Sequence, residues 1–91
     1  MKSYEILDHL SGVNPEAILW DGFDDAVVGI GSRVNLGPVA IYDRDKCLSI
    51  LMEQGLSCED AEEYFSYNVD GCYAGEHTPI IGVFNLEGET T

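Results

Sequence analysis

Basic residues are scarce in this sequence, and the second half of the chain has none. Across 91 residues, seventeen acids outnumber four bases, which gives a net charge of −13. The four bases all precede residue 47 and are Lys2, Arg33, Arg44 and Lys46. Affinity for DNA and RNA comes largely from lysine and arginine side chains on phosphates. The shortage of bases therefore argues against direct binding of nucleic acid, because the field of the protein repels polyanions.

Long apolar runs and paired cysteines are also missing. No apolar stretch approaches the roughly 20 residues of a membrane span, and the N-terminus lacks the apolar core of a signal peptide. Cys47, Cys58 and Cys72 form no CxxC pair, which argues against a zinc knuckle or a redox motif. We therefore expect a cytoplasmic protein with no membrane contact, no cofactor and three free thiols.

What remains is the composition of a small folded domain. With 45% apolar residues and nine aromatics, the chain is too hydrophobic to be a disordered tail. Its length is enough for one modest core. We predict a single domain over residues 1–91, with a core spanning about 4–84 and a polar tail at 86–91.

The first half of the chain predicts short helices and then a β-hairpin. A helix is expected over residues 3–10, with Ser3 as its N-cap and Gly12 as its stop. Asn14-Pro15-Glu16 predicts the start of a second, brief helix, because an Asx cap, a proline and an acid favour a first turn. Residues 26–33 and 39–42 predict two strands joined by a turn at 35–38.

The second half predicts two helices and a last strand. Asp43 is expected to cap a helix that buries Cys47, Leu48 and Leu51 and ends at Gly55. Ser57 opens the next helix, and a strand follows at 80–84. The apolar stripe expected on this helix consists of Ala61, Tyr64, Phe65 and Asn68. The predicted fold is therefore α+β: an antiparallel hairpin and a C-terminal strand packed on an αα-hairpin, with short N-terminal helices.

The acidic face of the second of these paired helices is the leading candidate for a binding surface. A helix-turn-helix that reads DNA would have to present this acidic face to phosphates, and the negative charges would repel each other. We therefore expect a protein partner with a basic surface, steered by charge and held by a few aromatic anchors. The predicted partner-binding residues are Glu59, Asp60, Glu62, Glu63, Asp70, Tyr67, Tyr73 and Glu76, and Phe84 is a further candidate anchor.

Other constellations give weaker hypotheses. Asp21, Asp24 and Asp25 place three carboxylates around Gly22, and hard cations such as Mg²⁺ or Ca²⁺ take oxygen ligands of this kind. The spacing is not that of an EF-hand, and turn chemistry also explains these residues. His77 has no defined catalytic partner, so no catalytic residues are predicted. A small metal- or ligand-binding module or enzyme using the Asp21–Asp25 loop stays open as the alternative.

Several segments between residues 15 and 84 follow a pattern found in other proteins. They are Asp21–Gly29, Tyr42-Asp43, Lys46, Ile50–Met52, Ala61–Phe65, Asn68-Val69, Gly71, Gly75-Glu76 and Thr78-Pro79. These segments resemble a group of small accessory proteins of phages and prophages. Members of that group look like short stand-alone proteins of unassigned role, so the resemblance implies a genomic context and no reaction. Related chains prefer alanine where this chain has Cys72.

The resemblance and the base-free second half of the chain together predict an inhibitor of a host protein, for example of a defence nuclease or its nucleic-acid groove. A homodimer closing on its own apolar surface stays open.

Overall fold

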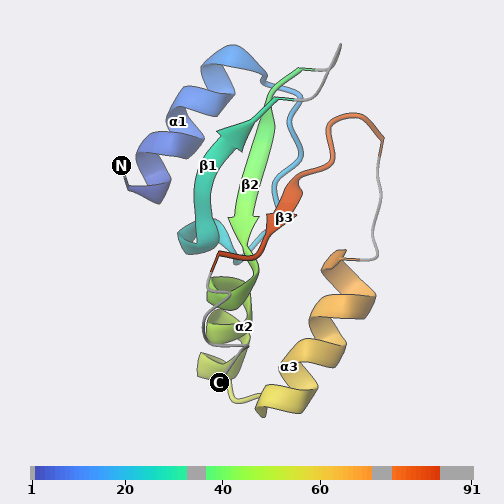
Figure 1. Cartoon of the computed structure of the whole chain (residues 1–91). Helices are drawn as coiled ribbons and strands as arrows, with labels where there is room; N and C mark the ends of the chain where they lie inside the picture. Colours follow the sequence, from blue (N-terminus) through green and yellow to red (C-terminus); the bar gives the residue numbers. More distant parts are fainter. Residues whose placement is uncertain (1, 33–36, 71–74, 85–91) are drawn as a thin grey trace.

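A three-stranded sheet with helices beside it and beyond one end forms the protein (Figure 1). The computed structural model describes residues 2–32, 37–70 and 75–84. The strands are β1 (Val27–Gly31), β2 (Val39–Asp43) and β3 (Ile80–Gly82), in the order β1-β2-β3. β1 and β2 are antiparallel, which confirms the predicted hairpin, and β3 runs parallel to β2. The α+β fold class is therefore confirmed.

The N-terminal helix α1 (Ser3–Val13) begins and ends differently from the prediction. Lys2 is the N-cap, and the Ser3 hydroxyl instead donates to the carbonyl of Val27 at 2.8 Å. The helix also continues through Gly12. Ser3 therefore ties α1 to the first strand, and the expected cap was wrong because a tertiary carbonyl takes its hydroxyl.

The predicted helix at Asn14-Pro15-Glu16 is also absent, because this segment makes a turn and then continues without regular secondary structure to residue 20. The side-chain Oδ1 of Asn14 accepts from the backbone N–H of Glu16 at 3.3 Å, while its side-chain amide Nδ2 donates to the carbonyl of Pro38 at 2.7 Å. Farther on, the backbone N–H of Trp20 donates to the hydroxyl of Tyr42 at 3.0 Å. The Asx signal starts a turn here, and these tertiary hydrogen bonds hold the following residues away from helical geometry.

Two paired helices continue the chain beyond β2, as predicted. α2 (Arg44–Glu53) begins at Asp43, whose carboxylate accepts from the backbone of Asp45 at 3.0 Å and of Lys46 at 3.4 Å. The chain reverses at Gly55, whose φ of +107° lies in the left-handed region that favours glycine. α3 (Cys58–Phe65) follows and continues as η2, a π-helical turn over Ser66–Asp70. The αα-hairpin is therefore confirmed.

One apolar core joins the sheet to all three α-helices. Tyr42 and Phe65 are the largest side chains with no exposed surface, and they belong to the same cluster of buried residues. α3 contributes Ala61 and Phe65 to this cluster, and η2 contributes Val69. The predicted stripe was thus wrong at Tyr64 and Asn68, which are both exposed. The buried positions 61, 65 and 69 recur every four residues, whereas the expected stripe combined the three- and four-residue spacings of a regular helix face.

The other face of the sheet is tightly fitted around Gly31. A Cβ atom at this position would lie 2.9 Å from Cδ1 of Ile80 and 3.1 Å from Cδ1 of Ile41. Real Cβ atoms do not approach this closely, so only glycine fits without a shift of these side chains.

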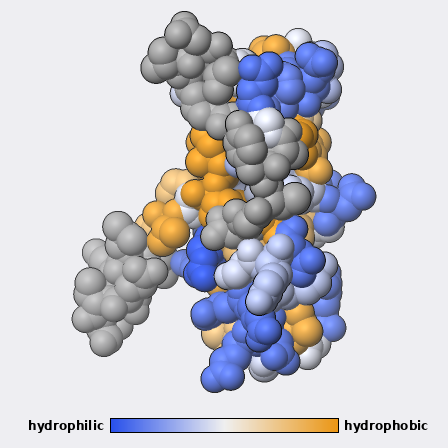
Figure 2. Space-filling model, turned by 90° about the vertical axis from the view of Figure 1, so that its right-hand side faces the viewer, coloured by the Kyte–Doolittle hydropathy of each residue, from blue (hydrophilic) through white to orange (hydrophobic). Residues whose placement is uncertain are grey.

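Figure 2 shows apolar residues gathered across the middle of the molecule, with hydrophilic residues at both ends. Among the helices that the structure describes, none has the length and apolar character that crossing a bilayer requires.

Candidate functional site

The outer face of α3 and η2 carries most of the residues predicted to bind a partner. Ser57 caps α3 by accepting from the backbone N–H of Asp60 at 3.1 Å. This is one half of the predicted capping arrangement. With Ala61 and Phe65 turned into the core, the remaining residues of the helix face solvent. Figure 1 shows α3 as an outlying element, held beside α2 beyond the end of the sheet.

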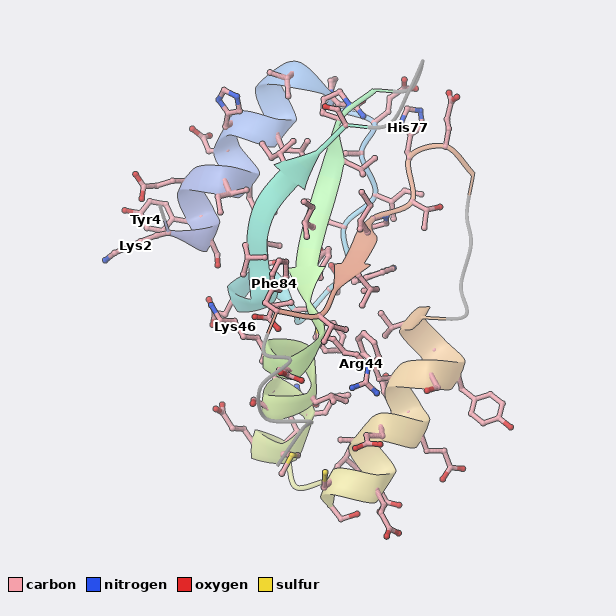
Figure 3. All side chains as sticks on the ribbon, in the orientation of Figure 1. Lys2, Tyr4, Arg44, Lys46, His77 and Phe84 are labelled. Atoms are coloured by element: carbon pink, nitrogen blue, oxygen red, sulfur yellow. The ribbon has the colours of Figure 1, made fainter. Side chains whose placement is uncertain are left out.

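Four carboxylates on α3 are exposed and have no basic partner among the described residues. They belong to Glu59, Asp60, Glu62 and Glu63, and within the described ranges none forms a salt bridge. Arg44 is the cation beside this helix, yet its guanidinium carbon lies 5.9 Å from the centre of the Phe65 ring. It sits between α2 and α3 (Figure 3). The acidic face therefore keeps its full charge available to a partner.

Two tyrosines join this acidic face. Tyr64 is 46% exposed and Tyr67 is 79% exposed. Together with Asp60, Glu63 and Asn68 they line an open hollow of about 510 Å³. Exposed aromatic rings of this kind are enriched at protein interfaces, where their area supplies affinity that charge alone does not. The site thus combines long-range attraction with apolar contact area.

The structure does not bring every predicted residue to this face. Glu76 lies near His77, with its Oε1 3.6 Å from His77 Nε2. His77 is at the opposite end of the sheet from Arg44 (Figure 3). Tyr73 lies outside the described residues, as does the side chain of Asp70. The candidate site therefore keeps the four carboxylates of α3 and Tyr67, and it gains Tyr64.

His77 and its neighbours form a second polar group. The Asn14 amide lies 3.4 Å from His77 Nδ1, and Glu16 Oε2 lies 3.8 Å from His77 Nε2. Ile18 donates its backbone N–H to the carbonyl of His77 at 3.1 Å. These contacts join the turn after α1 to the loop before β3. Their evident effect is structural, since they fasten two segments that lie far apart in the sequence.

The Asp21–Asp25 loop is a turn followed by the short 3₁₀ helix η1 (Asp24–Ala26). A contact from α1 holds the end of this loop, because the Ser3 hydroxyl also lies 3.3 Å from the carbonyl of Asp25. Within residues 2–32, 37–70 and 75–84, no three histidine, cysteine, aspartate or glutamate side chains gather as a metal site requires. The three aspartates of this loop therefore do not converge.

The two cysteines in the described part of the chain are free, and their surroundings differ. Cys47 is buried, and burial together with the Asp43 carboxylate raises the pKa of its thiol to about 12. Cys58 is exposed, and the pKa of its thiol is also raised, chiefly because it donates to the Glu62 carboxylate at 3.6 Å. Cys72 lies outside the described residues.

We expect iodoacetamide at pH 8 to label Cys58 and to leave Cys47 unlabelled until the protein unfolds. The thiolate is the reactive form, and Cys47, with a pKa of about 12, holds almost none of it at this pH and is also buried away from the reagent. Cys58 is exposed to the reagent, so labelling proceeds there although the pKa of its thiol is also raised. Peptide mapping by mass spectrometry, with and without denaturant, measures both sites in one sample. Equal labelling of the two thiols in the native protein would contradict the packing around Cys47.

Replacing Glu62 and Glu63 with glutamine is expected to leave the free energy of unfolding unchanged or to raise it by about 0.2–0.5 kcal/mol. The two side chains are exposed and repel the other acids of α3, and no described cation pairs with them. Denaturant unfolding of the double variant gives the value. A loss of more than about 1 kcal/mol would mean that these carboxylates are held by partners within the fold.

A scan against protein families found no match, and no curated protein or solved structure proved similar to the chain.

Proposed function

We propose that this protein is an acidic protein-binding domain that occupies a basic surface of another protein. The observation that carries the proposal is the face of α3 and η2. Here four carboxylates that pair with no base in the described part of the chain adjoin the exposed rings of Tyr64 and Tyr67. Charge of this density speeds association with a cationic surface, and aromatic anchors slow dissociation. Among basic surfaces, those that bind nucleic acid carry the matching charge, because they are built to receive phosphates.

The proposed role is that of an accessory protein that competes with nucleic acid for its partner. Carboxylates along a helix offer a partner's lysines and arginines the same sign of charge as a phosphate backbone. The resemblance to small phage-encoded proteins directs the search to host proteins, and to defence nucleases among them. The domain acts by occupying a surface and needs no chemistry of its own.

Affinity capture from a host lysate tests this proposal when it is made with two matched variants. Glu62→Gln with Glu63→Gln removes two charges from α3. Asp8→Asn with Glu53→Gln removes two exposed charges from α1 and α2. We expect the α3 variant alone to lose the captured protein, and the wild-type complex to weaken as salt rises. Capture that is equal for both variants would contradict a role for this face.

A further inference from the structure

The lining of the hollow divides the four carboxylates of α3 into two pairs. Asp60 and Glu63 line the hollow with Tyr64 and Tyr67, and Glu59 and Glu62 do not. Residues three and four apart lie on the same side of a helix, which places 60, 63, 64 and 67 along one stripe. Glu62 lies around the helix from this stripe, where it accepts from the Cys58 thiol, and Glu59 is four residues from Glu63 but outside the lining.

The hollow therefore has a specific chemical character that the acidic face as a whole lacks. Two phenol rings, 46% and 79% exposed, stand beside two carboxylates that have no salt bridge in the described part of the chain. Asn68 completes the lining, with its amide donating to the carbonyl of Tyr64 at 3.2 Å. Aromatic ring faces and carboxylates both attract cations, so a cation that enters the hollow is attracted by both kinds of group at once.

We infer that this hollow binds an arginine side chain of the partner. The inference rests on the proposed function and adds the chemistry of the group that the site receives. A guanidinium is planar and stacks on an aromatic face while its N–H groups donate to carboxylates. A lysine ammonium is a compact, strongly hydrated charge that does not stack. The site should therefore prefer arginine to lysine, which net charge alone does not do.

A pair of peptides of equal charge tests the preference without a natural partner. The probes are acetylated peptides with six Gly-Arg or six Gly-Lys repeats, titrated into the labelled protein in 50 mM salt. We expect the arginine peptide to bind about fivefold more tightly, since each exposed cation–π contact contributes a factor of about two to five. Tyr64→Leu with Tyr67→Leu should abolish the preference, and Tyr4→Leu on α1 (68% exposed in the wild type) is the matched control.

The two carboxylate pairs provide the second arm of the experiment. Asp60→Asn with Glu63→Gln and Glu59→Gln with Glu62→Gln remove the same charge from the same helix. We expect the first variant to weaken arginine-peptide binding about tenfold and the second about twofold, because only the first pair adjoins the rings. Thermal melting of each variant verifies the fold, and Tyr67→Leu alone serves as a milder change should the double tyrosine variant melt early.

The outcomes separate this inference from the proposed function. Equal weakening by the two carboxylate pairs, with equal affinity for both peptides, would overturn the arginine site and leave the acidic face as a binding surface. The absence of arginine-peptide binding to the wild type would also overturn it. The proposed function fails on a different observation, namely capture of host protein that does not depend on the α3 carboxylates.

Discussion

Phe65→Ala is expected to lower the free energy of unfolding by about 3–5 kcal/mol. The Phe65 ring has no exposed surface and lies in the cluster that joins α3 to α2 and the sheet. Its removal leaves a cavity, and it also takes away the ring beside which the Arg44 guanidinium lies. Such a loss is a large part of the total stability of a domain of this size.

Denaturant unfolding followed by circular dichroism measures this effect. Tyr64→Ala is the control, because it removes an aromatic ring from the neighbouring position of the same helix while that ring is 46% exposed. We expect the control to cost about 1 kcal/mol or less. Similar values for the two variants would mean that the buried and exposed faces of α3 are wrongly placed.

Tyr42→Phe is expected to lower the free energy of unfolding by about 1–3 kcal/mol. The substitution keeps the ring and removes the hydroxyl that accepts the backbone N–H of Trp20 at 3.0 Å. Tyr42 has no exposed surface and the hydrogen bond is part-buried, so the Trp20 N–H is left without its acceptor away from bulk water. Burial likewise raises the pKa of the Tyr42 hydroxyl, as expected for a group whose charged form is poorly solvated.

Trp20 is the only tryptophan of the chain and reports on this contact directly. Its ring centre lies 4.8 Å from that of Tyr42. We expect the Tyr42→Phe variant to change the tryptophan emission of the native protein as well as its stability. Tyr4→Phe, on the exposed side of α1, should change neither. An unchanged midpoint and spectrum in Tyr42→Phe would contradict the hydrogen bond.

The parts of the fold that the sequence predicts well are those that local chemistry determines. Asp43 and Ser57 cap their helices as expected, and Gly55 supplies the left-handed residue between them. Each of these signals acts within one turn of the chain. The segment at Asn14 shows where this reasoning fails, because its amide is satisfied by Pro38, 24 residues away. A local pattern carries no information about such a partner.

The sequence predicts the acidic residues of the candidate site better than it predicts the aromatic residues. The lack of bases after residue 46 indicates the acidic face directly. Tyr64 was expected in the core because it lies three residues after Ala61, on the expected apolar stripe. The spacing of Ala61, Phe65 and Val69 is the signal that could have placed Tyr64 outside. Glu76 was grouped with the acidic half by sequence, yet it lies beside His77, which is at the opposite end of the sheet from Arg44 (Figure 3).

The central claim is that the acidic face of α3 takes the place of nucleic acid on a basic partner. The most direct test is to add the protein to its captured partner bound to fluorescently labelled duplex DNA and to follow the anisotropy. We predict that the wild type and the Asp8→Asn, Glu53→Gln control release the DNA, and that Glu62→Gln with Glu63→Gln requires markedly higher concentrations. Release by all three proteins at the same concentration, or a ternary complex that retains the DNA, would contradict the account.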